Sequence, residues 1–236
     1  MRRQGQFLFR WRSYIPLVMF LPVAFFIRGC RYFCGGYGAD TVWKLLCLAV
    51  SLAGLAIRIL TVGYIYPGTS GRNTKYQEAD NLNTSGVYSV VRNPLYLGNI
   101  VMYTGVVMLA RNFWLSAFSM LFLLLYYERI IYTEECYLSE KYGERYLSWA
   151  QKTPLFVPDF RNYRRAETDF NLKLVLKKEF SGVFAIAAAF TLLDAVMNYT
   201  ASGRVFVGGF WLAYFSINFI FYITVLFLKK KTAILK

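Results

Sequence analysis

Histidine is absent from this 236-residue sequence, and acidic residues are scarce, with 13 Asp and Glu against 27 Lys and Arg. The lack of histidine excludes any mechanism that needs a His base. The four cysteines form no CxxC pair, so we expect no metal site of the kind built from His and Cys. Scattered free thiols are favoured, although Cys30 and Cys34 could form a disulfide if they lie outside a membrane-spanning segment.

Charged residues make up only 17% of the chain, whereas a soluble domain typically carries about 25%. Hydrophobic residues (57%) come in long blocks rather than at helix or strand period, which is typical of a membrane protein. The formal charge of +14 would suggest nucleic acid in a soluble protein. Here the basic residues lie between apolar blocks, so we expect loops beside anionic lipid and no nucleic-acid partner.

Six apolar blocks predict an all-α, polytopic membrane protein with about six transmembrane helices. The blocks cover residues 14–30, 42–66, 94–110, 113–133, 180–199 and 205–228. The first and third are short, and we expect kinked or tilted helices there. Only Arg111 and Asn112 separate the third and fourth blocks, which predicts a tight helical hairpin. Within the first block, the apolar run 14–27 is followed by Arg28 and Arg31, where a cleavage site would need small residues, so we interpret the block as an uncleaved span.

Most Lys and Arg residues fall on one side of the predicted membrane when the N-terminus is placed in the cytoplasm. We therefore expect both termini and the long segments 67–93 and 134–179 to be cytoplasmic, together with any active site. Within the spans, we expect Arg58 and Glu128 to approach each other, since an unpaired charge at that depth is expensive. Asp194 has no obvious partner and could face water.

Residues 92–98 read RNPLYLG and predict the start of the third span. Asn93 is a favoured N-cap and Pro94 a favoured first helical residue. Arg92 beside the positive end of a helix makes an anion site, while a capped helix with a snorkelling Arg is an equally good interpretation. Gly98 and Gly105 share a face that allows close approach of a helix or a ligand, and helix packing is the commoner reason.

Two neighbouring acids, Glu134 and Glu135, follow the fourth span directly. Neighbours on a helix point about 100° apart, so the two carboxylates need not repel each other strongly. Glu128, Glu135 and Tyr142 recur every seven residues and form one face that could receive a cation. An ordinary solvated helix surface is the alternative, which the scarcity of acids at a membrane boundary makes less attractive.

The stretch at residues 84–99 reads TSGVYSVVRNPLYLGN and resembles the signature of the isoprenylcysteine carboxyl methyltransferase and phospholipid N-methyltransferase superfamily, roughly GxYxxxR(H/N)PxYxG. The later stretch resembles the same family, with its acidic pair, the Tyr142-Gly143 dipeptide, Tyr146 and the prolines Pro154 and Pro158 in family order. The resemblance covers residues 82–160. These would be the methyltransferase core, preceded by spans one and two in 1–81 and followed by a basic linker and C-terminal hairpin in 161–236.

The resemblance implies a membrane methyltransferase that uses S-adenosylmethionine. In the family, the residues that line or shape the cofactor site match Tyr88, Arg92, Asn93, Pro94, Tyr96, Gly98, Glu134 and Glu135. Asn93 replaces the His of the best-known members, so it can hydrogen bond but cannot shuttle a proton.

The residues fit that cofactor. Arg92 suits its carboxylate, and either acid suits its ammonium while the other could bind ribose hydroxyls. Four tyrosines could pack on adenine or face the sulfonium, namely Tyr88, Tyr96, Tyr142 and Tyr146. We assign catalytic roles to Arg92, Glu135 and Arg161. Arg161 is the best candidate in the basic group 161–165 for an anionic headgroup, although a patch on anionic lipid is the favoured interpretation of that group.

The predicted function is methyl transfer to a lipid or lipid-linked acceptor, which could be an amine, a carboxylate or a phosphate oxygen. An NADPH-dependent reductase is the enzymatic alternative, because residues 141–143 also resemble membrane sterol reductases. A dinucleotide phosphate would not favour two carboxylates, which argues against it. A membrane scaffold without turnover is the non-enzymatic alternative. The sequence does not choose the acceptor or the oligomeric state.

Overall fold

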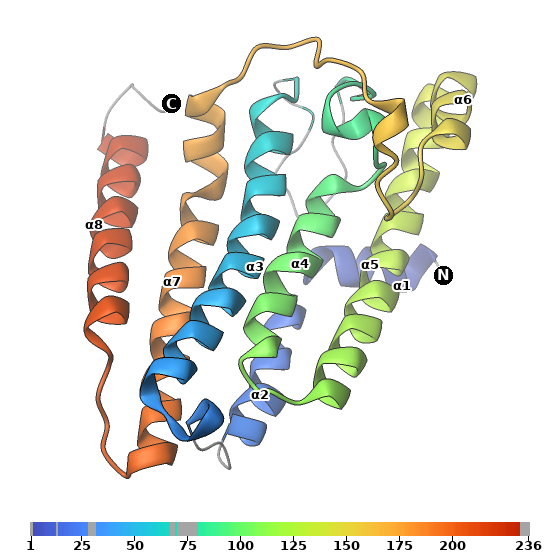
Figure 1. Cartoon of the computed structure of the whole chain (residues 1–236). Coiled ribbons are helices and arrows are strands. Elements are labelled where there is room, and N and C mark those ends of the chain that lie inside the picture. Colours follow the sequence, from blue (N-terminus) through green and yellow to red (C-terminus); the bar gives the residue numbers. More distant parts are fainter. Residues whose placement is uncertain (1, 13, 28–31, 67–68, 70–79, 232–236) are drawn as a thin grey trace.

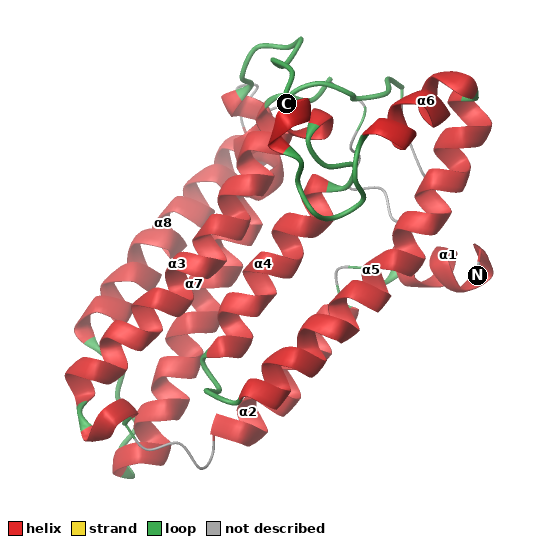
Figure 2. Cartoon of the chain, turned by 45° about the vertical axis from the view of Figure 1, so that its right-hand side comes forward, coloured by secondary structure: helices red, strands yellow, loops and turns green. Residues whose placement is uncertain are grey.

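The computed structural model describes residues 2–12, 14–27, 32–66, 69 and 80–231. Within them the chain is helical, and the only β-type pairing described is an isolated bridge between Gly86 and Arg164 (Figure 2). The α-helices are α1 (Arg2–Arg10), α2 (Phe20–Ile27), α3 (Tyr37–Gly63), α4 (Pro94–Met108), α5 (Phe113–Tyr142), α6 (Glu144–Lys152), α7 (Leu172–Ser202) and α8 (Gly209–Lys231). Short 3₁₀ helices are η1 (Ile15–Met19), η2 (Phe33–Gly35), η3 (Val87–Ser89) and η4 (Phe160–Asn162). The all-α prediction is confirmed for the described part.

The number of helices that can span a membrane is lower than predicted. In the described part, α3, α5, α7 and α8 are long and apolar enough, and the bent pair formed by α1 with η1 and α2 could add one more. The two halves of that pair meet at 80°. Helix α4 has 15 residues, or about 22 Å of length against a hydrocarbon core of about 30 Å. The expected count of about six spans is therefore not confirmed, because the first and third apolar blocks form short helices.

The predicted hairpin of the third and fourth blocks is confirmed. Helices α4 and α5 run side by side and are joined by four residues, 109–112 (Figure 1). The turn ends at Asn112, whose side-chain oxygen accepts a hydrogen bond of 2.9 Å from the Leu115 N–H and so caps α5. This hairpin carries both halves of the family signature toward the same end of the bundle.

Small residues bring α3 and α4 unusually close. A Cβ added to Gly98 would lie 2.6 Å from Cγ of Arg58 and 2.8 Å from the carbonyl oxygen of Gly54. Between the same two helices, the Ser51 hydroxyl donates to the Met102 carbonyl oxygen at 2.9 Å. Helix packing, the commoner of the two interpretations of Gly98 and Gly105, is what the structure shows.

The predicted pairing of Arg58 with Glu128 is wrong. Arg58 donates instead to both carboxylate oxygens of Glu179 on α7, at 2.9 and 2.7 Å, and to Asn99 at 2.7 Å. Glu128 is exposed. The error has a physical reason: Glu128 lies on the exposed face of α5, whereas α7 packs against α3 and brings the buried Glu179 to Arg58.

The expectation for Asp194 is also wrong. Asp194 is 2% exposed, and its Oδ1 lies 2.6 Å from Nζ of the buried Lys44. The proximity of α3 to α7 supplies the partner that was not obvious from the sequence. Cys34, Cys47 and Cys136 are free thiols. A pairing of Cys30 with Cys34 lies outside the described residues.

Candidate functional site

Two segments about 70 residues apart in sequence are bound to each other at one end of the bundle. The Arg92 N–H donates to the Pro154 carbonyl oxygen, and the Asp159 N–H donates to that of Val90, both at 2.9 Å. Gly86, with a φ of +60° that favours glycine, donates its N–H to the Arg164 carbonyl oxygen at 2.9 Å. The proline-rich stretch after α6 is therefore the backbone support of the loop that leads into α4.

Helix α4 begins at Pro94, as predicted, with Asn93 in the N-cap position. The Asn93 side chain makes no capping hydrogen bond, and its Nδ2 is buried without a partner. The predicted side-chain cap is therefore wrong, although the helix start is right. The first turn of α4 is therefore left uncapped by a side chain.

The cationic helix start and the acidic helix face do meet. Arg92 Nη1 lies 3.2 Å from Oε1 of Glu135, and both side chains are about three-quarters buried, at 21% and 25% exposed. Glu134 turns to other partners, because neighbours on a helix point about 100° apart. Its Oε1 accepts a hydrogen bond of 2.8 Å from the Tyr96 hydroxyl.

An aromatic cluster lies beside this ion pair. Tyr146 and Trp149 on α6 are buried with Leu82, their ring centroids are 5.6 Å apart, and Tyr88 and Tyr142 pack against them. Burial raises the pKa of Tyr88 and of Tyr146 well above the ordinary phenol value. The negative charges of Glu134 and Glu135 raise these pKa values further, against the opposing effect of nearby arginines. Both phenols are therefore neutral at physiological pH.

Five buried side-chain atoms in this region form no hydrogen bond. They are Arg92 Nε, Asn93 Nδ2, Glu135 Oε1, Tyr146 Oη and Trp149 Nε1. Of these, Glu135 Oε1 is ion-paired with Arg92, and the Tyr146 hydroxyl lies close to both residues of that pair. Each buried polar atom without a partner costs about 1–3 kcal/mol, so such a group concentrated in one place is expensive. The arrangement indicates a polar ligand that supplies the missing partners.

Two predicted site residues lie apart from this group. Gly98 faces α3, where it allows the close packing described above. Arg161 is exposed on η4, where its N–H donates to Oδ1 of Asp159 at 3.1 Å. Tyr88, Arg92, Asn93, Glu135, Tyr142 and Tyr146 are brought together, with Tyr96 and Glu134 adjoining them.

Sequence reasoning missed two residues of the site. Trp149 lies three residues after Tyr146 on the same face of α6, and that helical spacing was the available signal. Arg12, whose Nη1 lies 3.6 Å from Oε1 of Glu134, had no such signal because it is more than 100 residues away in sequence.

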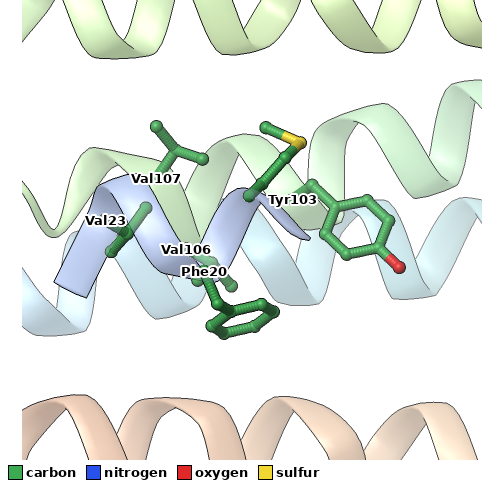
Figure 3. Close-up of a pocket in the computed structure, with 6 residues that line it drawn as sticks. Phe20, Val23, Tyr103, Val106 and Val107 are labelled. Atoms are coloured by element: carbon green, nitrogen blue, oxygen red, sulfur yellow. The ribbon is translucent and has the colours of Figure 1, made fainter. Parts of the chain in front are cut away.

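A separate small pocket lies between α2 and α4, deeper in the bundle. Figure 3 shows Phe20 and Val23 of α2 together with Tyr103, Val106 and Val107 of α4, which line this pocket. Tyr103 is seven residues beyond Tyr96, or about 10 Å along the helix, and its hydroxyl is the one polar side-chain group among the lining residues. This apolar lining does not suit a charged nucleotide, so the candidate cofactor site is the polar group at the helix start.

Part of the chain is similar to known proteins. Residues 44–145 match the family model described as phospholipid methyltransferase. The cobalt-zinc-cadmium resistance protein CzcN of Cupriavidus metallidurans is 31% identical over 123 residues, which are 51% of this chain and 54% of that protein. Protein-S-isoprenylcysteine O-methyltransferase B of Arabidopsis thaliana is 37% identical over 83 residues, 35% of this chain and 42% of that protein.

A third relative is the protein-S-isoprenylcysteine O-methyltransferase of Schizosaccharomyces pombe, 35% identical over 77 residues, which are 33% of each chain. The chain thus spans about half or less of the length of these relatives. No solved structure matches it significantly. The matched segment, residues 44–145, holds Arg92, Glu134 and Glu135, and this part of the chain is similar to the phospholipid and isoprenylcysteine methyltransferases.

Proposed function

We propose that this protein transfers a methyl group from S-adenosylmethionine to a lipid or lipid-linked acceptor at the cytoplasmic face of the membrane. The observation that carries the proposal is the Arg92–Glu135 ion pair, which together with Asn93, Tyr146 and Trp149 holds five buried polar atoms that form no hydrogen bond. It lies at the start of α4 and the end of α5, within the segment that matches methyltransferases.

The polar groups fit the chemistry of that cofactor. Arg92 would bind its carboxylate, and Glu135 would bind its ammonium or ribose hydroxyls. The ion pair between the two residues would then be replaced by contacts of each with the ligand. The Asn93 amide, the Tyr146 hydroxyl and the Trp149 indole N–H supply further hydrogen bonds. The flat faces of Tyr88 and Tyr146 suit adenine.

The cofactor would supply an electrophilic methyl group on a sulfonium. The protein's part is to hold the reactants in line and to keep water away, which leaves the acceptor nucleophile poorly hydrated. The raised pKa values of Tyr88 and Tyr146 keep these phenols protonated, so they do not compete with the acceptor for the methyl group. The acceptor could be an amine, a carboxylate or a phosphate oxygen, and Arg161 is the candidate for an anionic headgroup.

The test uses the purified full chain in lipid nanodiscs with methyl-labelled S-adenosylmethionine and a membrane lipid extract. We expect saturable cofactor binding and a labelled lipid product. Glu135→Gln should weaken binding at least about tenfold, since it removes a charge-assisted contact. Glu128→Gln is the matched control on the same helix, because Glu128 is exposed, and it should bind like the wild type.

Two results would contradict the proposal. Binding of NADPH in place of S-adenosylmethionine would indicate a reductase. Absence of cofactor binding and of methyl transfer in the wild type, with Glu135→Gln silent, would indicate a scaffold.

A further inference from the structure

Helix α1 packs across α5 just below the acidic pair. The two helices lie against each other in both views (Figures 1 and 2). Gly5 lies so close to Thr133 and the Arg129 carbonyl that a Cβ there would collide with both. The Tyr126 hydroxyl donates to the Leu8 carbonyl oxygen at 3.3 Å. The position of α1 is therefore fixed by the protein on one side.

The other side of α1 and of the chain just after it carries an aromatic strip. Phe7, Trp11 and Tyr14 are 60%, 44% and 63% exposed, and their rings contact one another in sequence at 6.4 and 5.9 Å. Exposed aromatic side chains of this kind are typical of the membrane–water interface. Helix α1 thus has one face on α5 and the other suited to lipid headgroups.

Arg12 connects this helix to the candidate cofactor site. Its guanidinium carbon lies 4.1 Å over the ring of the buried Phe9, and its Nη1 lies 3.6 Å from Oε1 of Glu134. The same Glu134 oxygen accepts the hydrogen bond of Tyr96, at the start of α4. An acid at a membrane boundary is expensive unless a cation or hydrogen-bond donors compensate its charge. Arg12 supplies the cation and Tyr96 the donor.

We propose that Arg12 is a positioning residue of the cofactor site, supplied by an interfacial helix that lies outside the matched family segment. It holds the Glu134 carboxylate in place beside Tyr96, which leaves Glu135 to Arg92 and to the ligand. Arg12 acts through Glu134 and touches no reacting atom. The inference rests on the proposed function, because it assigns Arg12 to the site of that cofactor.

The experiment measures the Kd for labelled S-adenosylmethionine in nanodiscs of phosphatidylcholine and phosphatidylglycerol. Arg12→Gln should raise the Kd about threefold to tenfold, a modest effect because the ion pair is partly exposed. Arg12→Lys should restore most of the affinity. Arg10→Gln, an exposed position on the same helix, is the matched control and should not change the Kd. Gly5→Leu should weaken binding as Arg12→Gln does, because it pushes α1 away from α5.

A double-mutant cycle separates positioning from general stability. In the Glu134→Gln background, Arg12→Gln should have no further effect on the Kd. A Kd for Arg12→Gln equal to that of Arg10→Gln, or an undiminished effect in the Glu134→Gln background, would overturn the assignment of Arg12. The same double-mutant cycle, measured by thermal unfolding without cofactor, gives the coupling between Arg12 and Glu134 in the folded protein. If the two substitutions are coupled in thermal unfolding but the protein binds no S-adenosylmethionine, the ion pair is confirmed. The proposed function, and with it the role of Arg12 at a cofactor site, would then be overturned.

Discussion

The two ends of the helical bundle both bury charged side chains, and they differ in how those charges are compensated. At the end away from the candidate site, Lys44 lies 2.7 Å from Asp40 and 2.6 Å from Asp194, and Arg111 pairs with Asp40 as well. Asp194 also accepts hydrogen bonds from Asn198 and from the Gly208 N–H, at 3.0 and 2.9 Å. Two acids and two bases there cancel in charge inside the protein.

At the other end, the charges of Arg92 and Glu135 also cancel, but this ion pair is about one-quarter exposed, and the neutral polar groups of Asn93, Tyr146 and Trp149 near it form no hydrogen bond. The contrast distinguishes a structural ion cluster from a binding site. The cluster around Lys44 is almost fully enclosed and its charges cancel among its own members, although Asp40 Oδ2 and Asn198 Oδ1 form no hydrogen bond. A site with buried polar atoms lacking partners gives up stability and recovers it when a ligand binds.

The largest effect should come from breaking the closed cluster. Lys44→Met leaves Asp40 and Asp194, which are 1% and 2% exposed, with only Arg111 as a cation. Removal of one partner from a buried ion pair typically costs about 3–5 kcal/mol, so thermal unfolding in detergent should occur at a clearly lower Tm. Lys173→Met, at an exposed position, is the control. A Tm equal to that of this control would show that the cluster contributes little to stability.

A smaller loss is expected at the bridge between α3, α4 and α7. Glu179→Gln keeps the shape of the side chain but removes the charge that pairs with Arg58, whose side chain is 21% exposed. Because the arginine retains some solvent and the Asn99 hydrogen bond, we expect about 2–3 kcal/mol, below the range for a fully buried pair. Thermal unfolding of Glu128→Gln serves as the comparison and should match the wild type. A loss in Glu128→Gln as large as that in Glu179→Gln would mean that the structure pairs Arg58 with the wrong acid.

The features that sequence predicted correctly depend on local chemistry. Asn93-Pro94 predicts a helix start wherever the chain lies, and Arg111-Asn112 leaves room only for a tight turn. The prediction that Arg92 and Glu135 lie close together came from the family signature rather than from a local sequence pattern. It could be predicted because both residues lie near the same end of one hairpin.

The features that sequence missed depend on which helices pack together. Arg58 and Asp194 each pair across the contact between α3 and α7, Arg58 with Glu179 and Asp194 with Lys44. No local sequence pattern specifies that α7 packs against α3. The role of Arg12 depends on the close approach of Gly5 to α5. A glycine in an N-terminal leader gives no sign of the helix it will contact. The span count failed for a simpler reason, since an apolar block need not be one continuous helix.

The smallest effect is the sharpest test of the contrast between the two ends of the bundle. The same substitution should raise the stability of the protein without ligand and weaken the binding of the ligand. Tyr146→Phe removes a buried hydroxyl that lies close to Glu135 and Arg92 but makes no hydrogen bond of good geometry. Without ligand, this relieves an unsatisfied polar group, and the Tm should rise by about 2 °C for roughly 1 kcal/mol in a chain of this size. With ligand, a hydrogen bond is lost, and the Kd for S-adenosylmethionine should rise about twofold to tenfold.

The control for this variant is Tyr163→Phe, since Tyr163 is 61% exposed and lies outside the aromatic cluster. It should change neither quantity. If Tyr146→Phe lowered both the Tm and the affinity, its hydroxyl would be satisfied inside the folded protein, and the site end would resemble the closed cluster. A higher Tm together with weaker binding can arise only if the hydroxyl serves the ligand rather than the fold, because a purely structural hydroxyl stabilises the protein in both states.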